Sequence, residues 1–195
     1  HEITSANGAG NGAGGAGHAT AGHSGAGINN PNNGGMMYGS GVECGSSGGN
    51  VTANTPSFGG RGGTTLILTA DTMTIDGSIS SNGENAQNGH VASSGTGPGG
   101  HGAGGGSAGS ILLQANTISI GATGTILAKG GDGGDGADGT QGPNPGIGMY
   151  DGGNGGGSGS GGFIEIITTA NGLTNNGLVN ADGGTSGMGG AAYGT

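Results

Sequence analysis

Apolar and polar residues alternate with a period of two in three stretches of the chain, near residues 65–83, 109–130 and 165–183. A period of two is typical of a strand with one buried face. Short polar pairs such as Asp71-Thr72 and Asp76-Gly77 interrupt the alternation, and they are of the kind that bends a strand without ending its layer. Each stretch is therefore predicted to form short strands separated by corners. No helical period is visible, so the fold class is predicted to be all-β, essentially without α-helix.

The three stretches are copies of one repeat. TLILTADTMTIDGSISSNG (65–83) aligns without gaps on EIITTANGLTNNGLVNADG (165–183), so that Leu66 meets Ile166 and Gly77 meets Gly177. The copy at 109–130 follows the same pattern with two extra residues near Ala122. A partial copy opens the chain, where SANG (5–8) matches NADG (180–183). Each copy offers few apolar side chains, so the copies are expected to stack as coils of a β-solenoid.

Glycine-rich arms separate the copies, and residues 1–195 are predicted to form a single elongated repeat domain. Its successive parts are a partial repeat (1–8), a glycine arm (9–58), a repeat (59–83), an arm (84–108), a repeat (109–130), an arm (131–161), a repeat (162–183) and a terminal arm (184–195). In the extended polyproline II conformation, glycine has no Cβ to keep neighbouring segments apart, so their main-chain N–H and C=O groups can pair. The arms are therefore predicted to form such a bundle, called polyglycine II, beside the strands.

Composition excludes several classes of protein. Glycine supplies 59 of 195 residues and charged residues only 7%, which lies far from an ordinary globular enzyme. The glycine spacing is irregular and there are only 5 prolines, so the chain is not collagen. The net charge of -9, with Arg61 and Lys129 as the two fixed cations, leaves no basic surface for nucleic acid or an anionic membrane. No apolar run is long enough to span a bilayer.

Two short motifs match catalytic or nucleotide-binding patterns. GNGAGG (10–15) fits the dinucleotide fingerprint and GSSGG (45–49) fits a nucleophile elbow. In a chain so rich in glycine such matches arise by chance, and neither stands between a predicted strand and a predicted helix. We therefore expect no enzyme activity, no catalytic residue and no organic cofactor.

Three aspartates recur at every third residue in GGDGGDGADG: Asp132, Asp135 and Asp138. On a three-fold helix they form one row with a spacing of about 9 Å, too long for one ion to bridge within that helix. A solvated acidic edge is the plainer interpretation. Calcium held between neighbouring helices is the alternative.

A second group of side chains suggests contacts between molecules. Methionine and tyrosine are the bulky anchors of the arms, and they are expected either to fill the seam between arm and strands or to cross to the next subunit. Cys44 is the single cysteine, so its thiol is either buried or bonded to another molecule. The candidate self-assembly residues are Ile3, Met36, Met37, Tyr38, Cys44, Met149, Tyr150, Met188 and Tyr193. Asn50-Val51-Thr52 is in addition a glycosylation sequon.

The pattern of residues 105–131, GGSAGSILLQANTISIGATGTILAKGG, resembles the glycine-rich solenoid repeats of large secreted or cell-surface proteins of bacteria and some protists. The arms are similar in kind to the polyglycine II domains of phage tail-tip adhesins and springtail antifreeze proteins. Strict three-residue spacing and the disulfides of the antifreeze proteins are absent from this chain. These resemblances imply an extracellular or cell-surface location, a structural or adhesive role, and no catalytic residue.

The frame in which the repeats begin and end predicts assembly. The chain starts with the tail of a repeat and ends within a glycine arm, without a polar capping coil, so the stacked copies are expected to expose open edges. Head-to-tail contacts between identical chains would extend these edges into an extracellular filament or matrix fibre. An adhesin or tail-tip module that binds a receptor, glycan or matrix through the arm tips is the alternative, and an ice-binding protein is the third.

Overall fold

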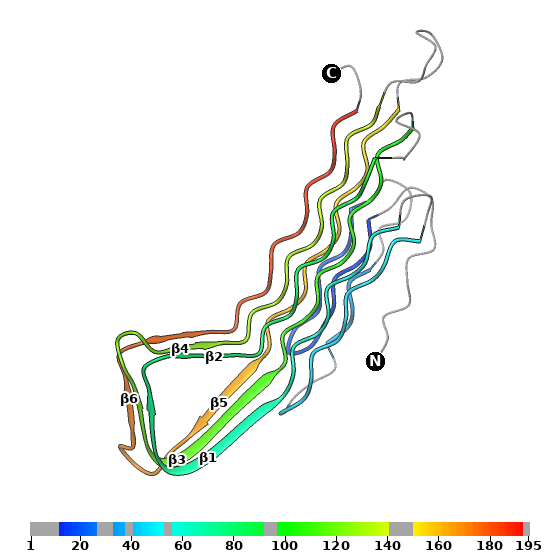
Figure 1. Ribbon diagram of the computed structural model, residues 1–195. Helices are drawn as coiled ribbons and strands as arrows, with labels where there is room; N and C mark the ends of the chain where they lie inside the picture. The colour runs from blue at the N-terminus through cyan, green and yellow to red at the C-terminus, as the bar shows by residue number, and fades with distance from the viewer. Residues whose placement is uncertain are drawn as a thin grey trace.

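The computed structural model describes residues 12–26, 33–37, 41–52, 56–91, 97–140 and 150–192. Figure 1 shows an elongated molecule in which strands gather at one end and long arms run side by side away from them. Strands and extended segments make up this part of the chain, and no helix occurs in it. The helix-free β architecture predicted from the sequence is therefore confirmed.

Two small parallel sheets stack the three copies of the repeat. The first contains β1 (Leu66–Ile75), β3 (Ser110–Ile120), β5 (Phe163–Ile167) and β6 (Leu173–Asn175), with β5 and β6 pairing successive parts of β3. The second contains β2 (Ser78–Ser80), β4 (Thr125–Leu127) and β7 (Leu178–Asn180) in the order β2-β4-β7. All pairs are parallel, so equivalent residues of the copies lie in rows across each sheet.

The register corrects one part of the sequence alignment. Met73 lies opposite Ile118 and Ile118 opposite Leu173, as the alignment predicts. Leu66, however, is in the row of Ile111 and Ile164, and not in that of Ile166. The reason is a turn between β5 and β6, where Gly172 donates its N–H to the Thr169 carbonyl and Asn171 has a φ of 61°. This turn absorbs two residues that β3 does not have.

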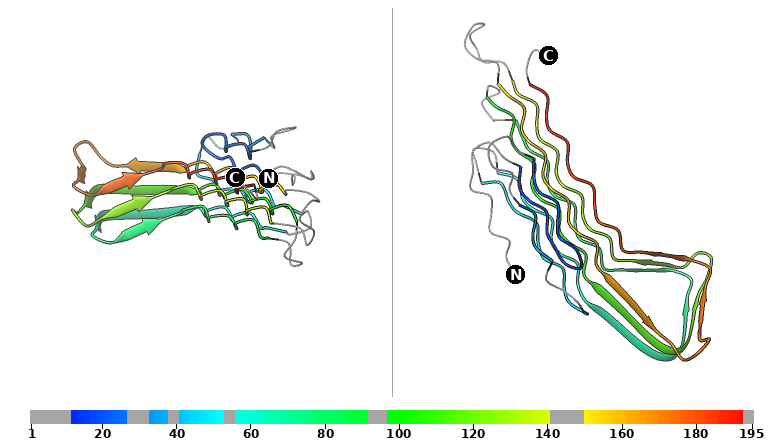
Figure 2. Two further views of the ribbon diagram at one scale, coloured as in Figure 1. Left: turned by 90° about the horizontal axis from the view of Figure 1, so that it is seen from above. Right: turned by 180° about the vertical axis from the view of Figure 1, so that it is seen from behind.

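The strands do not close into solenoid coils, so that prediction is corrected. Figure 1 shows them along an outline that stays open at the corner where the arms begin. After β2, β4 and β7 the chain continues into an arm, because glycine-rich sequence follows each of them. From the arms after β2 and β4 it returns to the strands only through another arm. Figure 2 shows the same arrangement from above and from behind.

The apolar core lies between the two sheets and is supplied mainly by the middle copy. Its largest fully buried side chains are Ile111, Leu113, Ile118, Ile120 and Ile126. Ile75 of the first copy is also buried in this cluster, whereas the other apolar residues of the first and third copies that pack against it are only partly buried. The copies therefore depend on stacking, and the middle copy alone has a neighbour on both sides.

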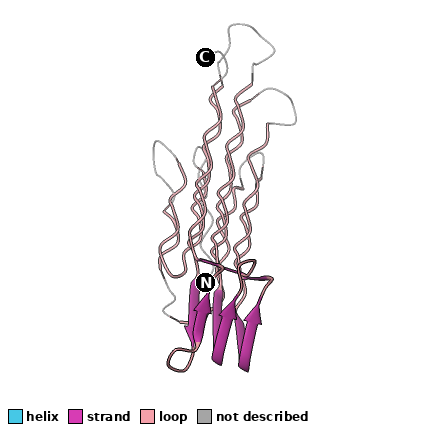
Figure 3. Ribbon diagram, turned by 90° about the vertical axis from the view of Figure 1, so that its left-hand side faces the viewer, coloured by secondary structure: helices cyan, strands magenta, loops and turns pink. Residues whose placement is uncertain are grey.

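The arms continue the sheets as rows of extended segments (Figure 3). We call those that follow β2, β4 and β7 the outgoing arms and those that precede β1, β3 and β5 the incoming arms. The outgoing arms comprise residues 81–91, 128–140 and 181–192, and the incoming arms residues 56–63, 97–109 and 150–162. A third layer comes from the N-terminal part of the chain, in residues 12–26, 33–37 and 41–52.

Main-chain hydrogen bonds join these segments in a three-residue rhythm, which is clearest in 97–109. Gly102, Ala103 and Gly104 donate their N–H groups to three different segments, through the carbonyls of Asn154, Gln87 and Gly49. The next three residues, Gly105, Gly106 and Ser107, donate their N–H groups to the same three segments one turn further along. Three other segments donate to 97–109 in return. This central segment is buried although its side chains are small, so the main chain itself forms the interior of the arm region.

Candidate assembly surfaces at the two ends of the stack

The stack of copies has two open ends. The first-copy end consists of β1, β2 and the outgoing arm 81–91, and the third-copy end consists of β5, β6, β7 and the outgoing arm 181–192. In the part of the chain that the structure describes, no strand pairs with the outer edge of β1 or β2, nor with that of β5, β6 or β7. Unpaired edges of this kind are templates for further strands.

Apolar side chains that are covered in the middle copy are open at these ends. Along the row Met73, Ile118 and Leu173, the middle residue is 1% exposed whereas Leu173 is 45% exposed. Along the row Ile79, Ile126 and Val179, Ile126 is fully buried and Val179 is 37% exposed. The ends therefore expose apolar side chains of the kind that an interior buries, as an interaction surface does.

An exposed ladder of Asn and Asp side chains crosses the outgoing arms. Asn82, Asn85 and Asn88 each accept, through Oδ1, the main-chain N–H of the facing residue in 128–140: Lys129, Asp132 and Asp135, all at 2.9 Å. Asp132, Asp135 and Asp138 repeat this towards the next arm, with the N–H groups of Thr185, Met188 and Ala191 at 2.8, 2.8 and 2.7 Å. Side chains thus satisfy the outward-facing N–H groups of each following arm.

This ladder explains the aspartate row that the sequence offered as a weak calcium candidate. One carboxylate oxygen of each of Asp132, Asp135 and Asp138 is used by a neighbouring main chain. Within the described ranges, no group of three or more His, Cys, Asp or Glu side chains comes close enough to hold a metal ion. Asp132 and Asp135 are half-buried and Asp138 is exposed, so the row lies at the edge of the arms and joins two of them.

The methionines among the candidate self-assembly residues face solvent. Met36, Met37 and Met188 are 82%, 64% and 73% exposed, so none of them fills a seam between arm and strands. Cys44 is exposed as well, which excludes the buried thiol, and its Sγ lies 3.4 Å from Oγ1 of Thr65. Tyr150 is half-buried at the start of an incoming arm. The remaining candidates, Ile3, Tyr38, Met149 and Tyr193, lie outside the described residues.

Asn50, the acceptor of the predicted glycosylation sequon, is exposed at the end of segment 41–52. Its Oδ1 accepts the N–H of Gly59 at 2.7 Å, which fixes the orientation of the side chain. The arm tips that sequence analysis proposed for receptor or glycan binding fall largely on residues outside the described ranges.

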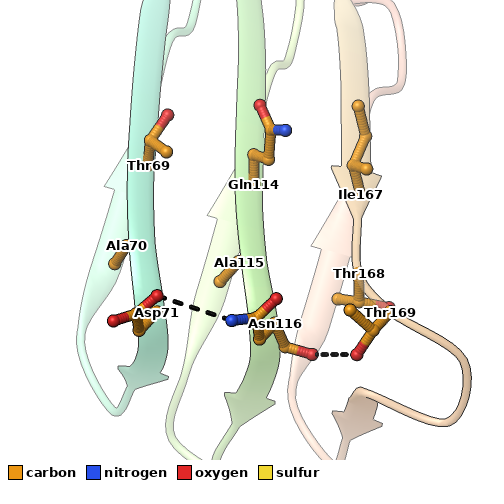
Figure 4. Close-up of a pocket in the computed structure, with 9 residues that line it drawn as sticks. All are labelled: Thr69, Ala70, Asp71, Gln114, Ala115, Asn116, Ile167, Thr168 and Thr169. Carbon is orange, nitrogen blue, oxygen red and sulfur yellow. Dashed lines mark hydrogen bonds between the residues drawn. The ribbon is translucent and has the colours of Figure 1, made fainter.

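A shallow cleft of about 300 Å³ lies across the strands, at the corner far from the arms. Figure 4 shows Asp71, Asn116 and Thr169 side by side in it, one from each copy. Asn116 donates from Nδ2 to Asp71 at 3.4 Å and accepts the Thr169 hydroxyl on its main-chain oxygen at 2.7 Å. These contacts crosslink the copies and leave further polar atoms of the same side chains facing the cleft.

Two histidines take part in contacts between arms. His101 Nδ1 accepts the N–H of Asn154 at 2.9 Å, and burial lowers the pKa of the His101 ring below its usual range. The neutral ring that this hydrogen bond requires is thereby favoured. His23 Nδ1 lies 2.9 Å from Ser158 Oγ and 3.3 Å from Ser186 Oγ, so it links the N-terminal layer to an incoming and an outgoing arm.

The asparagine part of the ladder was not predicted from the sequence. Asn82, Asn85 and Asn88 recur at the same three-residue spacing as the aspartates, and this spacing was a signal that they share a row. It was less visible because Glu84, Ala86 and Gln87 stand between them where glycines separate the aspartates.

The described residues contain no helix with the length and apolar character that crossing a membrane requires. No protein-family model, no curated protein and no solved structure matches the chain.

Proposed function

We propose that the chain is the structural subunit of an extracellular filament or matrix fibre, built by stacking identical chains head to tail. The observation that carries this proposal is the contrast, within the described residues, between a buried middle copy and two open outer copies whose outer strand edges are unpaired. A chain stacked on either end would give an outer copy the environment that the middle copy already has.

The gain from such stacking is substantial for so small a core. Leu173 and Val179 are 45% and 37% exposed, and full burial of an aliphatic side chain of this kind contributes about 1.5–3 kcal/mol relative to full exposure. Leu66, Leu68 and Met73 at the first-copy end are also only partly covered. New main-chain bonds along two sheet edges would add to this, with a net contribution of about 1 kcal/mol each.

The geometry favours an open polymer over a closed ring. The two ends of the stack are different surfaces, so their contact is heterologous, and parallel strands stacked in register repeat by translation along one axis. In such a polymer the strands would form two continuous parallel sheets, and the arms beside them would extend the three-residue hydrogen-bond pattern as polyglycine II. Side chains that are exposed here, such as Met36 and Met37, would remain on the flank for contacts between filaments.

Electron microscopy of the purified chain with two variants tests the proposal. Leu173→Asp places a carboxylate on the open core of the third-copy end, and Met36→Asp places one at an exposed position of the N-terminal layer. Negative-stain images of the unmodified chain and of Met36→Asp are expected to show uniform fibres, and Leu173→Asp a folded, unassembled particle. Sedimentation velocity and circular dichroism separate lost assembly from lost folding. An unmodified chain that stays monomeric at every concentration would contradict the proposal.

A second candidate function, recognition of a glycan, rests on the cleft that Asp71, Asn116 and Thr169 line. Carboxylate, amide and hydroxyl groups from three stacked copies can bind sugar hydroxyls in a row. In a glycan array, binding that Asn116→Ala abolishes would support this function. Fibres that form without binding any glycan would favour the structural role.

A further inference from the structure

We propose that the outgoing arms, and not only the strands, form the joint between chains and set its register. In this joint, which rests on the proposed filament, Gly183, Ser186 and Gly189 of one chain donate their N–H groups to the carbonyls of the next chain's Asn82, Asn85 and Asn88. The third-copy end of each chain therefore meets the first-copy end of its neighbour.

The bonds within one chain define this pattern. Gly83, Ala86 and Gly89 of the first outgoing arm donate to the carbonyls of Lys129, Asp132 and Asp135 at 2.9, 2.9 and 2.7 Å. The second arm repeats the pattern towards the third, where Gly130, Gly133 and Gly136 donate to Asp182, Thr185 and Met188 at 2.9, 2.8 and 2.8 Å. In the third arm the equivalent donors are the N–H groups of Gly183, Ser186 and Gly189, and their acceptors would belong to another chain.

The groups that this next step needs are open at both ends. Among the described residues, no hydrogen bond reaches the N–H groups of Gly183, Ser186 and Gly189. At the other end, neither the N–H nor the carbonyl of Asn82, Asn85 and Asn88 has a hydrogen-bond partner in the described ranges. All six residues are exposed. Donors at one end thus match acceptors at the other with the same three-residue spacing.

A corner glycine shows that the first-copy end is shaped for another copy. Gly77, Gly124 and Gly177 occupy equivalent corners. A Cβ on Gly124 would overlap the Ile75 carbonyl of the preceding copy, and one on Gly177 would overlap the Gly124 carbonyl. A Cβ on Gly77 would meet nothing within 4 Å, and its φ is not positive, so neither space nor backbone conformation within this chain requires glycine there. A preceding copy, supplied by another chain, would require it.

The third-copy end has the same feature in its arm. A Cβ on Gly130, Gly133 or Gly136 of the second outgoing arm would overlap a carbonyl oxygen of the incoming arm 150–162. At the equivalent positions of the third arm, a Cβ on Gly183 would lie 3.3 Å from its nearest neighbour and one on Gly189 would lie 3.6 Å away. Glycine is therefore present at two of the three equivalent positions of the third arm, and Ser186 takes the middle one, as Ala86 does in the first arm.

Side chains at the third-copy end fit the same partner. Asp182 occupies the ladder position that Asn82 fills in the first outgoing arm, and Thr185 the position that Asn85 and Asp132 fill in the first and second arms. Their oxygens can therefore accept the outward N–H groups of Asn82 and Asn85 in the next chain. Met188 takes the third position and offers no oxygen. The ladder thus continues across the joint at two of its three steps and ends at Met188.

Disulfide trapping in fibres tests the register. Single-cysteine chains Thr185→Cys and Asn85→Cys, each with Cys44→Ser, are mixed, allowed to assemble and oxidised, and the covalent dimers are identified by mass spectrometry. In the proposed register these two residues are neighbours in adjacent arms, within the Cα separation of about 4.4–6.8 Å that a disulfide spans. Asn88→Cys serves as the matched control, because three residues displace it by about 9 Å along the arm. We expect at least tenfold more dimer from 185 with 85 than from 185 with 88, and little from either variant alone.

The outcomes separate the register from the filament itself. Equal trapping of 185 with 85 and with 88, or efficient trapping of Thr185→Cys with itself, in fibres of normal appearance would overturn the register and leave the filament intact. An unmodified chain that forms no fibres would overturn both. As an independent check, Gly77→Val is expected to raise the critical concentration for assembly at least tenfold without unfolding the chain, whereas Gly41→Val, where a Cβ also meets nothing within 4 Å, leaves it unchanged. Equal critical concentrations for these two variants would count against the joint.

Discussion

Replacing Gly156 by alanine tests whether the main chain of the arms acts as a packed interior. Gly156 lies in the incoming arm 150–162, donates its N–H to the Gly134 carbonyl at 2.8 Å and accepts the N–H of Gly187 at 2.9 Å. A Cβ on Gly156 would fall inside the van der Waals envelope of the Ala103 carbonyl oxygen. Because that oxygen belongs to the main chain of a buried segment, it cannot turn aside as a flexible side chain would.

The expected cost follows from these contacts. Overpacking of an interior costs about 1–3 kcal/mol, and weakening two hydrogen bonds adds about 1 kcal/mol each. Alanine also reduces the freedom of the unfolded chain, which returns about 0.4–1 kcal/mol. The net loss in the free energy of unfolding is therefore about 2–5 kcal/mol, which lowers the midpoint of urea unfolding by about 1 M at an m-value near 3 kcal/mol/M.

Urea titration followed by far-ultraviolet circular dichroism measures this midpoint at a protein concentration too low for assembly. Gly41→Ala is the matched control, because a Cβ at Gly41 meets nothing within 4 Å, and its midpoint should equal or slightly exceed that of the unmodified chain. If Gly156→Ala unfolds at the same urea concentration as Gly41→Ala, close main-chain packing does not hold the arms together.

Three further tests probe the ladder, the core and the half-buried His101. Asp135→Ala should cost about 1 kcal/mol in the free energy of unfolding and speed hydrogen exchange at the Met188 amide, because that N–H loses its acceptor at 2.8 Å. Asp135→Asn keeps an acceptor oxygen and should change neither quantity. Equal exchange rates in the two variants would contradict the ladder. Leu113→Ala in the closed core should cost about 2–5 kcal/mol in the free energy of unfolding, and Leu173→Ala, in a core row but 45% exposed in the third copy, much less. Comparable costs in urea unfolding would contradict the assignment of the core to the middle copy. Because burial lowers the pKa of folded His101, the unfolded chain binds more protons at acid pH, so stability should be fully present above the unfolded pKa of about 6.5 and decline as pH falls below it. His101→Asn should flatten this decline in thermal unfolding between pH 7 and pH 5, and an unchanged profile would contradict it.

The strands were predictable from sequence because the period of two depends on which face is buried, and that is a local property. Leu66 and Leu68 alternate with Ile67, and the structure places them against the core cluster while Ile67 is 57% exposed. Pairing of glycine segments through their main chains was also predictable, since glycine has no Cβ to hold neighbours apart. The register of the third copy was not, because a turn at Asn171 absorbs two residues without leaving a gap in the sequence alignment.

The candidate surfaces were predictable only in part, because they depend on which segments become neighbours. Sequence analysis expected open edges at the ends of the stack but assigned self-assembly to bulky side chains such as Met36 and Met188. The polar ladder can be recognised only once Asn85 is known to face Asp132. The open space beside Gly77, where a Cβ would meet nothing, can be recognised only once Gly124 is known to face Ile75. A spacing of three residues identifies a row, but it does not say which row lies opposite.

The rise per chain in the assembled fibre, measured by cryo-electron microscopy, tests the account most directly. Three stacked copies at a strand spacing of about 4.8 Å predict a rise of about 14 Å per chain, with strands crossing the fibre axis at that spacing throughout. A rise near the length of an arm, about 40 Å for thirteen extended residues, would mean that chains join through their arm tips. That result, or discrete particles with no fibre at all, would contradict stacking as the basis of the protein's function.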